Sequence, residues 1–184
     1  MQKLYYVAGP SGAGNDTVMA WARERLPFAT PVAFAHRYIT RPADSGGENH
    51  IALSEYEFEL RLARGLFAMH WSSHGFRYGI GLEIRDWLAR GVSVVVSGSR
   101  EYLARAREAF PDLVYVHITA SPDVLRERLR ARGREEEAQV EARIERTAAV
   151  AGGLGPHDVE ILNHGRIDEA GRRLLDLLVP RRAA

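Results

Sequence analysis

Short apolar runs alternate along the chain with longer stretches whose apolar residues recur at helical spacing. The runs have the length of strands, and the one at 92–96 is dominated by valine, as in a strand buried on both faces. Strands that alternate with helices predict an α/β fold with a parallel central sheet covered by helices on both faces. We expect strands at 4–8, 31–36, 92–96, 113–118 and 159–162, and helices at 18–26, 54–64, 82–90, 101–110, 122–132, 134–150 and 168–179.

The interval 37–80 has a different pattern. A polar, glycine-rich segment precedes Ser54-x-x-Glu57, which is a capping box and predicts the start of a helix. Two β-like runs, 66–71 and 76–80, are separated by a polar turn and predict a hairpin. We therefore expect this interval to form a small insertion on the core.

Composition narrows the class of protein. Hydrophobic residues make up 46% of the 184 residues and charged residues 27%, as in an ordinary soluble domain. The net charge of +1 and the lack of a basic stripe with interleaved aromatic residues disfavour nucleic acid as a partner, and no apolar stretch reaches membrane-spanning length. The absence of cysteine excludes disulfides and a cysteine nucleophile. No signal-peptide pattern is seen, so a cytoplasmic location is expected.

One glycine-rich stretch is the most informative part of the chain. It reads Gly9-Pro10-Ser11-Gly12-Ala13-Gly14-Asn15-Asp16-Thr17. It follows an apolar run and opens into a helical pattern, which is the context that a phosphate-binding P-loop requires. Glycines let backbone N–H groups converge on a phosphate, and the start of the helix adds a partial positive charge. For the loop alone, a glycine-rich turn that binds nothing is the alternative.

This stretch departs from the P-loop pattern at one position. The spacing from Gly9 to Gly14 fits G-x-x-x-x-G, but Asn15 stands where the pattern has lysine. That lysine would neutralise charge on the β- and γ-phosphates, whereas asparagine donates a hydrogen bond without a charge. Lys3 is the only lysine in the sequence and precedes the first predicted strand, so the missing charge has to come from arginine.

Arginines are dense between 126 and 146. On the predicted helix, Arg128 and Arg132 are spaced i, i+4 and therefore share one face. A row of arginines there would supply positive charge to bound phosphates. The alternative is a solvated helix whose arginines pair with neighbouring glutamates, and the helix taken alone favours that alternative.

A second polar cluster combines 36–41 with 48–50. The first segment is a basic strand end with Arg37 and Arg41, and the second is a polar loop segment that includes His50. This combination suits a second anionic ligand. The histidines have no metal-ligand spacing, so no histidine metal site is expected. Two further candidates lie near the ends of β-like runs: Tyr78 and Arg100.

Several features recur together in one group of enzymes. They are GPSGAG at 9–14, Thr40-Arg41-Pro42, Phe58, Gly65-x-Phe67, Tyr78-Gly79, Arg128–Gly133, Arg143 and Asn163. In these features the chain resembles the guanylate-kinase-like group of P-loop kinases over nearly its whole length. The resemblance implies one domain over 1–184, and it divides that domain into a core (1–36, 81–125 and 143–184), a substrate-binding insertion (37–80) and a lid (126–142).

The same resemblance implies roles for individual side chains. Arg128, Arg132 and Arg143 would be lid arginines around the transferring phosphoryl group, and Arg41 and Tyr78 would contact the phosphate of the acceptor.

The guanine-reading residues of that group are absent. Met69 stands at the position of the base-binding glutamate, Ser97 near that of an aspartate, and Asp44 at that of a second arginine. A guanine base would therefore leave several hydrogen bonds unmade, and each of them is costly. Guanylate kinase activity is disfavoured.

A more specific resemblance rests on 36–41, 48–54, Tyr78-Gly79 and 98–100. These segments resemble the ribose 1,5-bisphosphate phosphokinases, small kinases of phosphonate breakdown, which also have aspartate after the P-loop lysine. The resemblance implies ATP-dependent phosphorylation of ribose 1,5-bisphosphate to 5-phosphoribosyl 1-diphosphate, with Mg²⁺ between the β- and γ-phosphates. Asn15 departs from this family too, which has lysine there.

The site residues expected on this basis fall into three groups. Residues 9–17 bind the phosphates of ATP, and Asp16 is a candidate Mg²⁺ ligand. The two phosphates and the hydroxyls of the sugar are assigned to Arg37, Arg41, His50, Tyr78 and Arg100. Two alternatives stay open, namely another small-phosphate or nucleotide kinase on this scaffold, and a nucleotide-binding protein in which Asn15 has removed turnover. The sequence does not define the oligomeric state.

Overall fold

The computed structural model describes residues 2–45, 48–132, 139, 141–142, 144 and 154–179. The chain forms two compact units. One unit joins the residues up to Tyr6 to Pro31–Leu113, and the other joins Val7–Thr30 to the chain from Val114 onwards. The helix predicted over 134–150 lies largely outside the described residues. Within the described ranges, no helix combines the length and the apolar character needed to cross a membrane.

The larger sheet confirms the predicted α/β architecture. Its strands are β1 (Leu4–Ala8), β2 (Val32–Phe34), β7 (Ser93–Ser97), β8 (Val114–Thr119) and β9 (Val159–Leu162). Their order is β2-β7-β1-β8-β9. β2 runs parallel to β7, and β8 runs parallel to β9 with Val116 opposite Val159. Every residue of β1 is buried, as the unbroken apolar run predicted.

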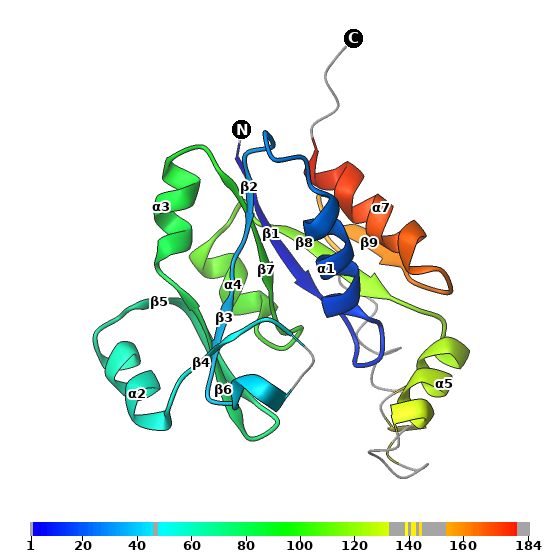
Figure 1. The fold of residues 1–184 in the computed structure, drawn as a ribbon, viewed down its shortest axis with the longest axis horizontal. Coiled ribbons are helices and arrows are strands. Elements are labelled where there is room, and N and C mark those ends of the chain that lie inside the picture. Colours follow the sequence, from blue (N-terminus) through cyan, green and yellow to red (C-terminus); the bar gives the residue numbers. More distant parts are fainter. Residues whose placement is uncertain are drawn as a thin grey trace. The chain divides into compact units, whose positions relative to one another are not determined.

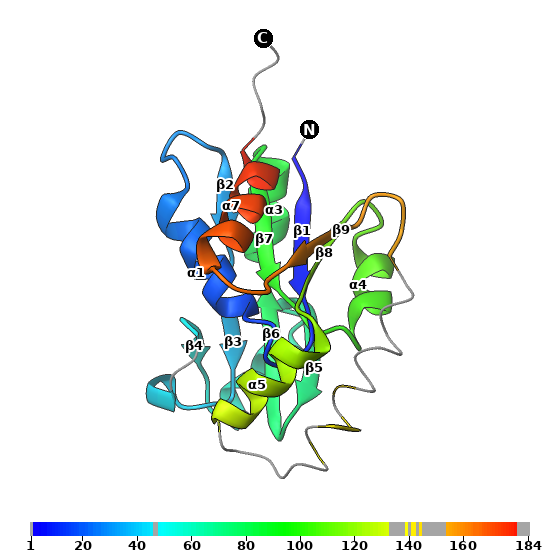
Figure 2. The same cartoon turned by 90° about the vertical axis from the view of Figure 1, so that its right-hand side faces the viewer.

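Among the described residues, the unit that contains Val7–Thr30 includes three helices whose bounds are defined. They are α1 (Asn15–Arg25), α5 (Pro122–Arg132) and α7 (Ile167–Leu178). α1 and α7 lie side by side (Figure 1 and Figure 2). Gly171 permits this approach, because a Cβ at that position would overlap the indole of Trp21. The amphipathic pattern of α7 buries Leu174 and Leu178.

The other unit contains the smaller sheet and further helices. Its remaining elements are β3 (Arg37–Ile39), β4 (Ile51–Ala52), β5 (Phe67–Ser73), β6 (Phe76–Gly81), α2 (Glu55–Ala63), α3 (Glu83–Ala89), α4 (Leu103–Ala109) and the short 3₁₀ helix η1 (Ala43–Ser45). The smaller sheet has the order β4-β3-β6-β5. The hydroxyl of Ser54 accepts a hydrogen bond of 3.1 Å from the backbone N–H of Glu57, which confirms the predicted start of α2.

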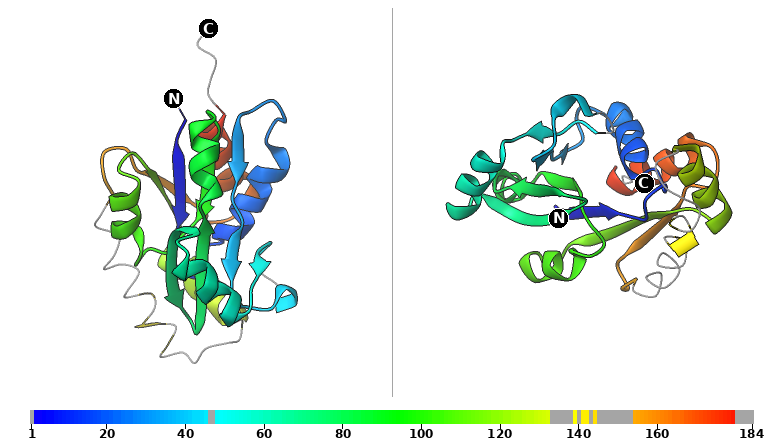
Figure 3. Two further views of the ribbon diagram at one scale, coloured as in Figure 1. Left: turned by 90° about the vertical axis from the view of Figure 1, so that its left-hand side faces the viewer. Right: turned by 90° about the horizontal axis from the view of Figure 1, so that it is seen from below.

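The predicted hairpin is present as the antiparallel pair β5 and β6, drawn in teal and green in Figure 3. Its turn has His74 at φ 50° and Gly75 at φ 77°, both in the left-handed region. Positive φ at both central residues matches a type I′ turn, whose twist suits a two-residue hairpin.

One predicted strand is shorter in the structure, and a strand that was not predicted follows it. The run 31–36 was predicted as a strand, but β2 covers only Val32–Phe34, and the chain enters the smaller sheet as β3 from Arg37, outside the predicted run. The N–H of Ala35 still donates to the carbonyl of Val95 at 2.9 Å, whereas Arg37 pairs with Ile80. The hydrophobic pattern continues through Ala35, so it contains no sign of the change of partner.

Candidate active site

The glycine-rich loop links β1 to α1, as predicted. Gly14 is the N-cap of α1 with φ 84°, in the left-handed region that residues with a side chain rarely adopt. Gly9 lacks a side chain for another reason, since a Cβ there would overlap the carbonyl oxygen of Ile118 in β8. The glycines therefore fix both the curvature of the loop and its close approach to the strand beside it.

Asn163 fastens the loop from the end of β9. Its side-chain amide donates a hydrogen bond of 2.7 Å to the carbonyl of Ala13, and its backbone N–H donates to the carbonyl of Thr119 at 2.7 Å. The residue is buried. Sequence reasoning noted Asn163 as a shared feature but gave it no role, because a contact over 150 positions leaves no local pattern.

Arg128 extends from α5 to the same loop. Its Nη1 donates to the carbonyl of Gly12 at 3.4 Å, and the side chain is half-buried. Arg128 therefore does not lie only on a solvated face. A cavity of about 330 Å³ opens here, lined by Gly12, Gly14, Thr17, Arg128, Ala131, Asn163, Gly165 and Ile167. Of the other two predicted lid arginines, Arg143 and the side chain of Arg132 lie outside the described part of the chain.

A neighbouring arginine on α5 makes the ion pairs that a solvated helix would have. Arg126 donates through Nε to one oxygen of Glu141 at 2.6 Å and through Nη2 to the other at 3.1 Å. It also contacts Asp123 at 2.7 Å. Hydrogen bonds from Arg126 hold the pKa of Glu141 below its ordinary value. Glu141 is thereby tied to α5 by a bidentate contact.

The first residues of α1 complete the loop. Asn15 begins the helix, and its buried side-chain oxygen has no hydrogen-bond partner among the described residues. Asp16 lies in the first turn, where a carboxylate is stabilised by the positive end of the helix dipole, and it remains partly accessible. The described residues contain no cluster of three metal-ligating side chains. Mg²⁺ is commonly held by one or two carboxylates together with substrate phosphates, so a single carboxylate at Asp16 fits that chemistry.

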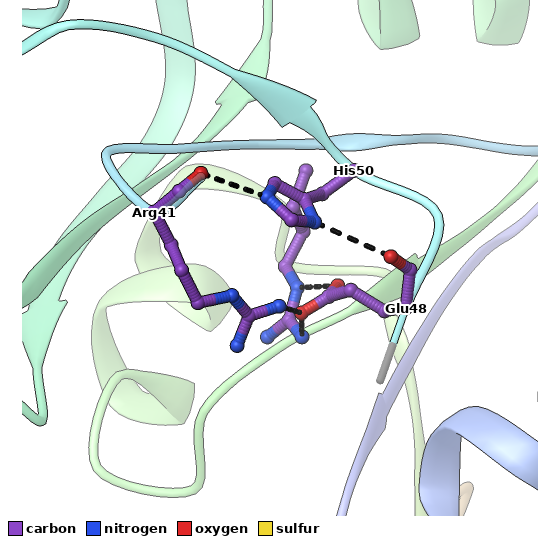
Figure 4. A network of polar contacts seen from close by, with 4 residues as sticks. Arg41, Glu48 and His50 are labelled. Atoms are coloured by element: carbon purple, nitrogen blue, oxygen red, sulfur yellow. Dashed lines mark hydrogen bonds and ion pairs between the residues drawn. The ribbon is translucent and has the colours of Figure 1, made fainter. Parts of the chain in front are cut away.

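The predicted acceptor residues are found in the other unit, where Arg37, Arg41 and His50 form a polar network with Glu48 (Figure 4). Arg37 binds both carboxylate oxygens of Glu48, with its Nε 2.6 Å from Oε2. Arg41 contacts the same carboxylate through Nη2 at 3.1 Å. Glu48 was named within the sequence cluster but not as a site residue.

His50 is buried between two backbone carbonyls. Its Nε2 lies 3.0 Å from the carbonyl oxygen of Arg41, and its Nδ1 lies 3.3 Å from that of Glu48, as Figure 4 shows. Both ring nitrogens thus face the protein's own backbone. This geometry supports a role in closing the loop more than the direct ligand contact that the sequence predicted.

One face of the Arg37 guanidinium is covered by an aromatic ring. The guanidinium lies over the ring of Tyr78, 5.2 Å from its centroid, and Tyr78 stacks on Trp71 at 5.5 Å with an interplanar angle of 4°. Tyr78 is buried. Arg100 follows Ser99, whose backbone N–H and carbonyl both pair with the hydroxyl of Tyr6 in the same unit.

The positions that read guanine in guanylate kinases have apolar or small side chains here. Met69 is fully buried in β5, and Ser97 is buried at the end of β7. A thioether offers only a weak acceptor to a base. The structure thus gives no reason to expect a guanine site at these two positions.

Comparison with known proteins agrees with this geometry. The sequence profile of the guanylate kinase family matches residues 1–180. The solved structure of guanylate kinase from Anaplasma phagocytophilum has a TM-score of 0.70 at 20% identity, over 96% of this chain and 84% of that one, and shows the fold alone.

Curated relatives are much more similar in sequence. "Ribose 1,5-bisphosphate phosphokinase PhnN" of Thiobacillus denitrificans is 54% identical over 96% of this chain and 92% of its own length. The protein of the same name from Desulfomicrobium baculatum is 55% identical over 97% of this chain and 95% of its own. The chain therefore belongs to the guanylate kinase family and, within it, to the ribose 1,5-bisphosphate phosphokinases.

Proposed function

We propose that the chain transfers the γ-phosphoryl group of ATP to ribose 1,5-bisphosphate and forms 5-phosphoribosyl 1-diphosphate. The observation that supports kinase activity is the glycine loop at the start of α1. Asn163 and Arg128 both donate hydrogen bonds to this loop, and a cavity lies beside it. The names of the relatives support the choice of acceptor.

The ATP phosphates are assigned to the loop from Gly9 to Thr17. Its backbone N–H groups and the positive end of α1 favour an anion, and Arg128 adds a full charge beside them. Arg132 and Arg143 are proposed as further lid arginines. Mg²⁺, when bound, would supply positive charge to the phosphates of ATP, and Asp16 is the residue proposed to hold it.

The acceptor is assigned to the arginine cluster of the other unit. Arg37 and Arg41 are the groups proposed for a phosphate of the sugar, because guanidinium groups match phosphate oxygens in a bidentate way. Arg100 and Tyr78 are proposed as further contacts, and His50 is proposed to shape the loop beside them.

The proposed reaction needs no strong base. An oxygen of the acceptor's 1-phosphate is already ionised, and it attacks the γ-phosphorus of ATP. The bond from that phosphorus to the β–γ bridging oxygen breaks, and ADP leaves with the electron pair. Catalysis then consists of positioning and neutralisation of charge.

Asn15 is expected to lower the rate of phosphoryl transfer. Without the loop lysine, the arginines are the source of charge at the γ-phosphate. By analogy with removal of one oxyanion donor, the missing contact costs about 10²–10³ in rate. The Asn15→Lys variant is therefore expected to be faster than the natural chain while keeping the same acceptor.

An acceptor panel tests the proposal. The natural chain and Asn15→Lys are incubated with ATP–Mg²⁺ and ribose 1,5-bisphosphate, ribose 5-phosphate or GMP, and ADP formation is followed. We expect turnover with ribose 1,5-bisphosphate and none with GMP. Turnover only in Asn15→Lys would favour a nucleotide-binding protein instead. Turnover with another acceptor alone would show that the acceptor is wrong.

A further inference from the structure

The carboxylate of Glu48 is the centre of the arginine cluster and has no role in the assignments above. Its side chain is 11% exposed, and those of Arg37 and Arg41 are 12% and 21% exposed. A largely buried carboxylate is stable when charged partners satisfy it, and here two guanidinium groups do so. Glu48 thus differs from an exposed ion pair, which contributes little to stability, because it is largely buried and shared by two arginines.

The charges of the cluster explain why a carboxylate is required there. Two guanidinium groups that share a partly buried site repel each other, and a carboxylate between them offsets that repulsion. The set of Arg37, Glu48 and Arg41 carries a net charge of +1. It can therefore still attract a phosphate monoester.

Both arginines are held in place by several contacts. Arg37 is bound along one edge by Glu48 and across its face by the ring of Tyr78. Arg41 shares the carboxylate, and its buried Nε has no hydrogen-bond partner among the described residues. A buried donor without a partner is costly, so this N–H group is suited to an incoming acceptor such as a phosphate oxygen.

The backbone around Glu48 is also fixed. His50 lies against the carbonyls of both Glu48 and Arg41, and the side-chain amide of Asn49 lies 2.9 Å from Nε2 of His36, which directly precedes β3. The short segment 48–50 is thus tied to the start of β3, where Arg37 lies.

We propose that Glu48 is the positioning residue of the anion site for the acceptor. It holds Arg41 beside Arg37 so that the Nε–H of Arg41, unpartnered among the described residues, and the charge of the two guanidinium groups receive a sugar phosphate without rearrangement, and it does not itself contact the substrate. This inference rests on the proposed function, because it takes the anion to be a phosphate of ribose 1,5-bisphosphate. The competing account makes Glu48 an internal anion that blocks the arginines and is displaced by phosphate.

The two accounts predict opposite changes in the KM for ribose 1,5-bisphosphate when Glu48 is replaced by glutamine. The amide keeps one acceptor oxygen but loses the negative charge, and its NH₂ group is directed at the Nε–H of Arg37. The repulsion between the two guanidinium groups is then no longer offset, so the arginines are held less firmly. If Glu48 positions them, the KM for ribose 1,5-bisphosphate rises about 10-fold or more, as for loss of a charge-assisted hydrogen bond, while the KM for ATP stays nearly constant. If Glu48 blocks them, the KM for the sugar falls.

Conservative and control variants separate positioning from general destabilisation. Glu48→Asp keeps the charge with a shorter reach and is expected to recover part of the affinity. Glu59→Gln removes a carboxylate that pairs with Arg77 at a site where its side chain is 59% exposed, and it is expected to leave both KM values unchanged. In an Arg41→Ala background, Glu48→Gln is expected to have a smaller effect, because the two residues act through one contact.

Calorimetric titration with ribose 1,5-bisphosphate in the absence of ATP gives the affinity directly. Weaker binding in Glu48→Gln with an unchanged KM for ATP supports the inference. Tighter or equal binding, or parallel loss of ATP and sugar affinity, overturns it. A natural chain that neither binds nor phosphorylates the sugar would refute the proposed function, and the inference with it. Turnover in both proteins with the same KM for the sugar would refute the inference alone.

Discussion

The contact between Asn163 and the glycine loop gives a sharp test of how the loop is held. The Asn163→Ala variant removes the side-chain amide that donates to the carbonyl of Ala13 at 2.7 Å. In the variant, the carbonyl of Ala13 loses the side-chain donor that Asn163 provides among the described residues. Because Asn163 is buried, water does not readily replace that donor. The backbone bond from Asn163 to Thr119 is unaffected, which keeps the perturbation local.

The magnitude follows from the cost of a buried polar group without a partner. That cost is about 1–3 kcal/mol. For a chain of this size, each kcal/mol lowers the Tm by about 2–4 °C. We therefore expect a Tm lowered by about 2–12 °C and, because the freed carbonyl belongs to the phosphate loop, a KM for ATP raised by up to about 100-fold. The KM for the acceptor is expected to change little.

Thermal unfolding and steady-state kinetics with each substrate varied in turn are the assays. Asn49→Ala is the matched control, since it removes an exposed amide contact to His36 in the other unit and is expected to leave the KM for ATP unchanged. A lowered Tm without any change in the KM for ATP would show that Asn163 only supports the core.

Three further predictions concern other parts of the chain. Arg41→Ala is expected to raise the KM for the acceptor much more than that for ATP in the same kinetic assay, and equal effects would contradict its assignment. The Arg126–Glu141 ion pair is complete above the ordinary carboxylate pKa and is lost as the pH falls through the lowered pKa of Glu141. Thermal scans of natural chain and Glu141→Gln from about pH 7 to pH 3 should therefore converge at the acid end, and a constant difference would contradict this. Gly171→Ala places a methyl group against Trp21 and is expected to cost about 1–3 kcal/mol in denaturant unfolding, whereas an unchanged midpoint would show that α7 can shift away from α1.

Much of the fold follows from patterns that are local in sequence. The valine-rich run 92–96, the capping box at Ser54 and the turn at His74-Gly75 each correspond to a structural element at the expected place. In each case the information lies within a few residues, because hydrophobic burial, side-chain capping and positive φ are properties of short segments.

The parts that were missed depend on contacts between distant residues. The break between β2 and β3 reflects a change of pairing partner, from Val95 to Ile80, that the apolar run does not record. The role of Glu48 depends on two arginines that precede it by 11 and 7 positions, and it is visible only once the loop has folded back on its strand. The sequence pattern singled out the two arginines, but only the fold shows which carboxylate binds them.

The most direct test of the account is transfer of the γ-phosphoryl group of ATP to ribose 1,5-bisphosphate, followed by ³¹P NMR with Mg²⁺ present. The account predicts that the resonance of the sugar's 1-phosphate is replaced by the two coupled resonances of a diphosphate, while the 5-phosphate resonance persists and ADP accumulates. Unchanged sugar resonances in both the natural chain and Asn15→Lys, or a new phosphate at any other position of the sugar, would contradict it.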